Sequence, residues 1–207
     1  MTRDQLKEKL LNYLPPNGIE QCIDFITLHK ISVRITHSRR TKLGDYRAPF
    51  NGSAHRISIN HNLNKYSFLI TFIHEVAHLT AFNRYKHTIV PHGQEWKAEY
   101  KTLLRPFLAA NVFPDDLHHA LDNYLKNPAA SSCTDEKLYR TLKKYDAQNS
   151  HQLLEDLPEG SEFKLKGYSN VFIKGHLLRK TYHCKMKDSK REYRISGLAE
   201  VQQITLF

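Results

Sequence analysis

The sequence has few cysteines and no long apolar segment. Its three cysteines, Cys22, Cys133 and Cys184, include no pair separated by only two residues, which excludes a structural zinc site made of four cysteines. Three cysteines with no evident pairing fit a reducing compartment, although an odd count alone proves nothing. The first residues are polar and charged, and no apolar run approaches the roughly 20 residues that span a bilayer. We therefore expect a cytoplasmic protein with no membrane partner.

Acidic residues are scarce relative to basic ones. Lysine and arginine total 31, against 21 aspartate and glutamate residues, and the formal net charge is +10. This excess favours a polyanionic partner such as nucleic acid. Hydrophobic residues make up 40% of the 207 positions, which suffices for one substantial domain and one small domain.

The most informative feature present is His74-Glu75-Val76-Ala77-His78, which lies within an apolar run. We expect residues 65–85 to form a helix, on which side chains four residues apart share one face. His74 and His78 can then bind a single zinc ion about 2.0–2.1 Å from each nitrogen. Glu75 lies one residue further round the helix, where it can take a proton from a water in the open fourth position. The pattern predicts a zinc hydrolase with Glu75 as its general base.

A stable zinc site needs a third protein ligand. We expect His92 to supply it, because this residue directly precedes a second amphipathic helix over residues 93–110, which is placed to close over the first. Two alternatives remain open. Glu95 would give a site of two histidines and one carboxylate, and His87 lies in the connecting loop.

The motif from His74 to His78, followed by His92-Gly93-Gln94-Glu95-Trp96, resembles the SprT-like metalloprotease family, which includes Spartan. Residues 39–44 and 57–60 are similar to the hairpin that precedes the zinc helix in that family. The resemblance covers roughly residues 1–125. It implies an α+β, zincin-like metalloprotease domain with one Zn²⁺ ion and, by analogy with Spartan, cleavage of proteins on single-stranded or damaged DNA. Many members end in a four-cysteine zinc ribbon, so the chain is similar to a bacterial-type member that lacks it.

The remaining pattern divides the chain into two domains. A linker of small and polar residues at 127–132 predicts a boundary between a metalloprotease domain, 1–127, and a C-terminal domain, 133–207. The second domain would begin with a short helix over residues 135–145 and continue as a small β-rich structure. Helices are further expected over 4–14 and 19–29, and strands over 31–35, 54–60, 162–166, 171–174, 179–185, 192–195 and 201–207.

The second domain carries a concentration of positive charge. Residues 163–194 contain ten lysines and arginines and only two acidic residues. Aromatic residues alternate with them, as in small β modules that bind single-stranded nucleic acid; the ordinary alternative is that the rings form the core and the lysines are solvated. A second basic cluster precedes the zinc helix and would either steer nucleic acid or form a solvated turn. The candidate nucleic-acid contacts are Arg39, Arg40, Lys42, Lys164, Lys166, Lys174, Arg179, Lys180, Lys185 and Arg191.

Together these features predict a zinc-dependent metalloendopeptidase that acts on nucleic-acid-associated proteins. Two other functions stay open: a zinc-containing DNA-binding module with little or no proteolytic activity, and a hydrolase of non-peptide amides. Glu75 argues against the first, because a purely structural zinc site needs no general base.

Overall fold

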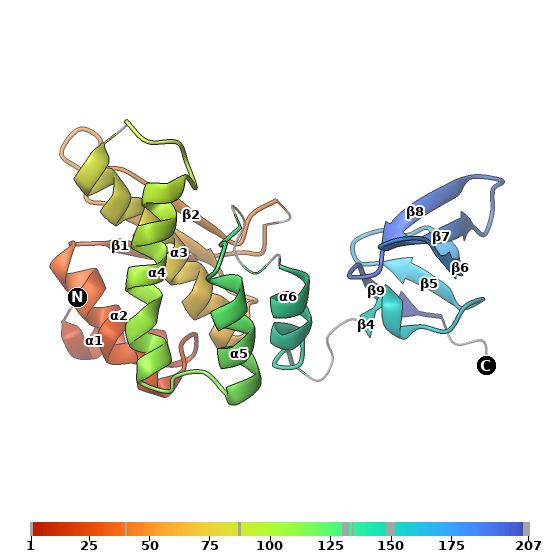
Figure 1. The fold of residues 1–207 in the computed structure, drawn as a ribbon, viewed down its shortest axis with the longest axis horizontal. Helices are drawn as coiled ribbons and strands as arrows, with labels where there is room; N and C mark the ends of the chain where they lie inside the picture. Colours follow the sequence, from red (N-terminus) through yellow and green to blue (C-terminus); the bar gives the residue numbers. More distant parts are fainter. Residues whose placement is uncertain are drawn as a thin grey trace. The chain divides into compact units, whose positions relative to one another are not determined.

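The computed structural model describes residues 2–39, 41–86, 88–129, 133, 135–147 and 152–204. The chain divides into two compact units, Met1–Asp146 and Ala147–Phe207 (Figure 1). It has a mixed α+β fold with two separate sheets, one in each unit. No helix in the described part of the chain is both long enough and apolar enough to cross a membrane.

The centre of the first unit is a 21-residue helix, α3 (Lys65–Tyr85), whose bounds agree with the helix expected from the sequence. The helix begins at Asn64, whose side chain accepts a hydrogen bond from the backbone N–H of Ser67 at 2.9 Å. Every residue from 67 to 77 is buried. A helix buried on all sides belongs in a core, so it can hold polar side chains at fixed positions away from bulk water.

The described part of the first unit contains five other helices. Helix α4 (Gln94–Ala109) packs against it through a buried face that includes Trp96, Tyr100 and Phe107. Helix α1 begins with a capping box between Thr2 and Gln5. The remaining bounds are α1 (Arg3–Leu11), a 3-10 turn (Pro16–Gly18), α2 (Ile19–Leu28), α5 (Asp115–Tyr124) and α6 (Glu136–Lys143).

A three-stranded sheet covers another side of α3. Its strands are β1 (Ser32–Thr36), β2 (Gly44–Arg47) and β3 (Arg56–Asn60), in the order β1-β3-β2. The central strand β3 is parallel to β1 and antiparallel to β2. Ile57 and Ile59 of β3 are fully buried toward the core. Because strand residues alternate between faces, Ser58 and Asn60 point to the opposite face of the sheet.

Helix α6 belongs to the first unit, although the sequence placed the corresponding segment in the second domain. It packs against α5, and its apolar residues Leu138 and Leu142 are buried in the core of the first unit. The side chain of Asn64 also donates to the backbone carbonyl of Leu142 at 3.0 Å. The chain therefore divides after residue 146 and not at the expected linker, of which residues 130–132 lie outside the described residues.

The second unit contains an antiparallel six-stranded sheet with the order β4-β9-β5-β6-β7-β8. One face of the sheet covers a small core that includes Phe163, Phe172, Cys184 and Val201. The expected strand over 201–207 overlaps β9, and residues 205–207 of that expectation lie outside the described residues. The strands are β4 (Gln152–Leu153), β5 (Glu162–Leu165), β6 (Val171–Leu177), β7 (Thr181–Met186), β8 (Glu192–Ser196) and β9 (Glu200–Gln203), with a 3-10 turn at Leu154–Asp156.

Candidate metal centre

Three histidines of the first unit converge on one point. The Nε2 atom of His92 lies 2.9 Å from Nε2 of His78 and 3.2 Å from Nε2 of His74. Nitrogen ligands of one tetrahedral zinc ion lie about 3.3 Å apart, given Zn–N bonds of about 2.05 Å. The three side chains therefore fit a single zinc ion. They are the one group of three or more candidate ligands found among the described residues.

Two local structures bring these nitrogens together. His74 and His78 project from the same face of α3. His92 lies in the turn before α4, where the backbone N–H of Gly93 donates to the carbonyl of Val90 at 2.9 Å. His92 has a φ of 60°, a left-handed conformation that non-glycine residues seldom adopt. Such backbone strain persists where the surrounding structure enforces it, and it is concentrated at functional sites.

The environment keeps the three imidazoles neutral. Burial, together with the smaller effects of His78 and His92, lowers the pKa of His74 to about 3. Burial likewise lowers the pKa of His78 to about 4, and it lowers the pKa of His92. A metal ion binds the neutral ring, whose nitrogen lone pair is free, so the group is ready to accept a cation at neutral pH.

The histidines rest on buried aromatic rings of α4. The ring of His74 lies 4.6 Å from that of Trp96, which stacks on Tyr100 at 5.1 Å. These rings restrict the orientation of the imidazoles. Of the two alternative third ligands, Glu95 does not belong to the histidine group, and His87 lies outside the described residues.

Glu75 is 6% exposed, and its carboxylate lies against strand β2 at Gly44. A Cβ atom built on Gly44 would lie 2.4 Å from Oε1 of Glu75, so only a glycine permits this approach. The backbone N–H of Tyr46 also donates to the carboxylate. Burial and then the charge of Asp45 raise the pKa of Glu75 to about 8. A cation near Glu75 would act in the opposite direction, because it favours the ionised carboxylate, which is the form that can accept a proton.

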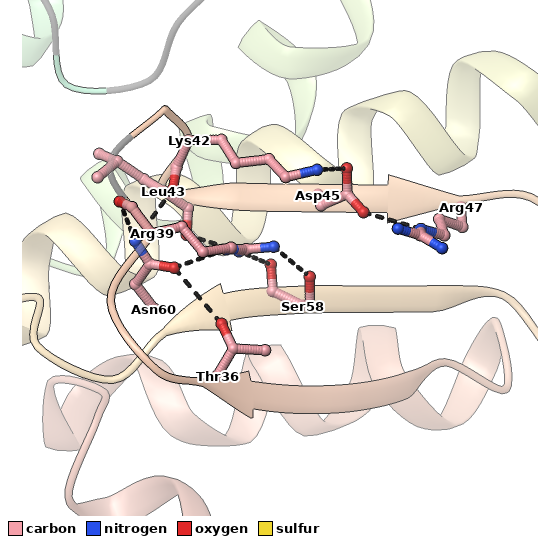
Figure 2. Close-up of polar contacts among 8 residues, drawn as sticks. All are labelled: Thr36, Arg39, Lys42, Leu43, Asp45, Arg47, Ser58 and Asn60. Carbon is pink, nitrogen blue, oxygen red and sulfur yellow. Dashed lines mark hydrogen bonds and ion pairs between the residues drawn. The ribbon is translucent and has the colours of Figure 1, made fainter.

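The basic hairpin before α3 is occupied by internal contacts (Figure 2). Arg39 donates to Asn60 and Ser58 and to the carbonyl of Leu43, a set of contacts that we call the Arg39 clasp. Lys42 forms an ion pair with Asp45 at 2.6 Å. Arg39 and Lys42 therefore have partners within their own unit, and their contact with nucleic acid stays a prediction. Arg40, the other expected contact in this cluster, lies outside the described residues.

One of the expected nucleic-acid contacts in the second unit, Lys174, is buried. Lys174 is 4% exposed, and its Nζ donates to the carbonyls of Glu155 and Leu157 and lies 3.9 Å from the Tyr182 ring. Lys174 is therefore a buried structural lysine. The alternation of strand residues predicts that Lys174 points inward, but its positive charge led to the expectation that it is exposed. Lys166 and Lys185 form ion pairs with Glu200 and Glu192, respectively, whereas Lys164, Arg179, Lys180 and Arg191 are exposed.

Most of the aromatic residues between these lysines are not free to stack on bases. Phe163 and Phe172 are buried, and Tyr182 and Tyr193 pack against the same core. Tyr168, at 53% exposure, is the one clearly exposed ring of the five. Four of the five rings therefore contribute to the core of the second unit.

Comparison with known proteins identifies the region that contains the site. The SprT-like family model matches residues 18–116, which include the three histidines and Glu75. No individual curated protein and no solved structure matched the chain.

Proposed function

We propose that the chain belongs to the SprT-like family, whose model matches residues 18–116, and that it is a zinc-dependent endopeptidase of zincin-like architecture. The family is associated with zinc and with metalloprotease activity. The observation that carries the proposal is the convergence of three histidines, two of which lie on the same helix as the buried residue Glu75. A structural zinc site would need the histidines but not Glu75.

In the proposed reaction His74, His78 and His92 would hold one Zn²⁺ ion. When bound, the ion lowers the pKa of a water molecule and polarises the scissile carbonyl. Glu75 takes a proton from the attacking water and delivers it to the leaving amine. The Tyr46 N–H and the backbone at Gly44 hold the Glu75 carboxylate in place for both transfers.

We further propose that the substrate binds as an extended chain along strand β2. This strand is at the edge of its sheet and lies directly beside Glu75. Backbone pairing with an edge strand recognises any extended peptide, with little dependence on its side chains. Specificity would then come from whatever brings the substrate near.

Digestion of casein tests the proposed activity. The protein should digest casein, a zinc chelator should abolish digestion, and added Zn²⁺ should restore it. Parallel reactions with single-stranded DNA separate the alternatives. A zinc-containing DNA-binding module would bind DNA without digesting casein. A hydrolase of non-peptide amides would leave casein intact and cleave small amide substrates.

We also propose that the exposed basic residues of the second unit bind nucleic acid. Such binding would bring the protein close to nucleic-acid-associated proteins, which would be its substrates. With few rings exposed, binding would depend mainly on phosphate contacts. Three or four contacts to a single strand predict a log-log salt slope of about −2 to −3. Fluorescence anisotropy of a labelled oligonucleotide measures this slope in the full chain.

Variants of the full chain locate the nucleic-acid surface. Replacing Lys164, Arg179 and Arg191 together with alanine should reduce the slope and weaken binding. Replacing Arg34 and Arg47 in the first unit should leave binding unchanged. The reverse result would assign the surface to the hairpin before α3.

A further inference from the structure

The Arg39 clasp uses nearly the whole guanidinium group. Its Nε donates to Oδ1 of Asn60 at 2.8 Å, Nη1 donates to Oγ of Ser58 at 3.0 Å, and Nη2 lies 3.3 Å from the carbonyls of both Leu43 and Ser58 (Figure 2). The planar guanidinium group of arginine has several donors in fixed positions and holds its partners in one geometry. The flexible ammonium group of lysine cannot do this. The clasp thereby joins the segment before β2 to the central strand β3.

Asn60 completes the clasp from the buried side. It is 1% exposed, and its amide donates to the carbonyls of Arg39 at 3.3 Å and Lys42 at 3.0 Å. Its backbone N–H donates to the carbonyl of Leu43 at 2.9 Å. The Leu43 carbonyl thus accepts from both Asn60 and Arg39. The position of Leu43 is fixed from two directions immediately before β2 begins.

Gly44, the next residue, is the part of β2 that meets Glu75. Gly44 and Tyr46 face α3, whereas Ser58 and the guanidinium of Arg39 lie on the other face of the sheet. The clasp and the carboxylate are therefore on opposite faces of the same short edge strand. Strand β2 pairs with β3 on one side, and the contacts before Gly44 add a second attachment of this strand to β3.

We propose that Arg39 and Asn60 are positioning residues, which hold β2 where its backbone orients the Glu75 carboxylate. The inference rests on the proposed function of Glu75 as general base. The clasp contacts none of the three histidines, so its loss should change the orientation of the base without removing the metal. A displacement of about 1 Å at a reacting group reduces turnover by about 100-fold.

Arg39→Ala tests the proposal, with Arg34→Ala as the matched control. Arg34 is exposed and lies on β1 in register with Ser58, so both variants lose one positive charge near the same place on the sheet. We expect kcat for a fluorogenic peptide to fall by about 10- to 100-fold in Arg39→Ala, with KM and zinc content within about twofold of wild type. Arg39→Lys should resemble Arg39→Ala, because the fork and not the charge positions the strand.

Free guanidinium ion at millimolar concentration should restore part of the kcat of Arg39→Ala and have no effect on Arg34→Ala. A merely structural role predicts instead that stability and zinc content fall together and that guanidinium does not restore turnover. That result would overturn the proposal, as would a wild-type kcat in Arg39→Ala.

A second measurement does not depend on catalysis. In chelator-treated protein the Tyr46 amide proton, which donates to Glu75, should exchange at least about tenfold faster in Arg39→Ala than in Arg34→Ala, while amides of α3 are unchanged. NMR-detected hydrogen exchange measures both. If the wild-type protein had no peptidase activity, this test would still support or refute the positioning of β2. Equal Tyr46 exchange in the two variants would overturn the proposal even if peptidase activity were established.

Discussion

Replacing Gly44 with alanine should separate turnover from metal binding. The added Cβ would lie 2.4 Å from Oε1 of Glu75 and 2.7 Å from Cγ2 of Thr71, whereas ordinary contacts begin near 3.4 Å. Gly44 is not among the residues with a positive φ, so alanine fits the backbone and the difficulty is one of space. Either the strand or the carboxylate must move by about 1 Å. The three histidines lie away from this contact and should keep their geometry.

The magnitude follows from the size of this displacement. Misplacing a reacting group by about 1 Å reduces turnover by about 100-fold, and we expect this loss in kcat. Overpacking costs about 1–3 kcal/mol of folding stability. The reduced freedom of the unfolded chain offsets about 0.4–1 kcal/mol of that loss. We therefore expect a net destabilisation of about 1–2 kcal/mol, which leaves most of the protein folded.

Three assays on the same preparation decide the outcome: peptidase kcat, zinc per chain by elemental analysis, and urea denaturation. A double-mutant cycle with Glu75→Ala identifies the clashing group. Because that substitution removes the carboxylate, Gly44→Ala should destabilise the Glu75→Ala protein by less than it destabilises the wild type. The reasoning would be refuted if Gly44→Ala retained wild-type kcat, or if it lost zinc and turnover in parallel.

Two further predictions concern the histidines. His92→Ala should lose most of its zinc while Glu95→Ala retains it, because His92 and not Glu95 belongs to the converging group; zinc analysis of both purified variants checks this, and the opposite pattern would make Glu95 the ligand. The second prediction uses metal-free Glu75→Gln protein, because the raised pKa of Glu75 would change stability with pH in the opposite direction. From about pH 7.5 to about pH 5, the titration of His74 alone should lower the free energy of unfolding of this variant by about 2 kcal/mol. Burial lowers the pKa of His74 to about 3 in the folded protein, so below about 6.5 the unfolded chain takes up a proton that the folded chain does not, and stability decreases with falling pH. A pH-independent urea midpoint would contradict this.

The sequence predicted α3 and the grouping of the histidines because both depend on local patterns. The bounds of α3 follow from the Asn64 cap and from an apolar run that extends around the helix. Two histidines four residues apart on a helix share one face. The third, His92, lies in the turn directly before the helix that packs against α3, so it can approach the other two. The left-handed φ of His92 could not be anticipated, because histidine gives no sign of it.

Strand β2 was not predicted because its form depends on what it touches. The sequence Gly44-Asp45-Tyr46-Arg47 has no clear alternation, and its glycine disfavours a strand unless a close neighbour requires one. That neighbour is Glu75. Helix α6 was assigned to the wrong side of the boundary for a related reason. Its apolar face indicates that it must pack against something, but not which unit supplies the surface.

The charge pattern was the least informative part of the sequence. Arg39 and Lys174 were both expected to contact nucleic acid, yet each donates hydrogen bonds to carbonyl groups of its own unit. Composition counts charges, but the partner of a long side chain depends on tertiary contacts. The burial of Lys174 could have been predicted, because it lies two residues after Phe172 and therefore on the same, inward face of β6.

The central claim is that Glu75 is the general base of a zinc peptidase. The measurement that tests it most directly is casein digestion by zinc-loaded wild-type and Glu75→Gln proteins, with zinc per chain determined on the same samples. Glutamine can still hydrogen-bond a water molecule but cannot accept its proton, so we predict one zinc ion per chain in both proteins and digestion at least about 100-fold slower in the variant. Digestion by Glu75→Gln at the wild-type rate would contradict the role of Glu75, and a fully zinc-loaded wild-type protein that leaves casein intact would contradict the proposed activity itself.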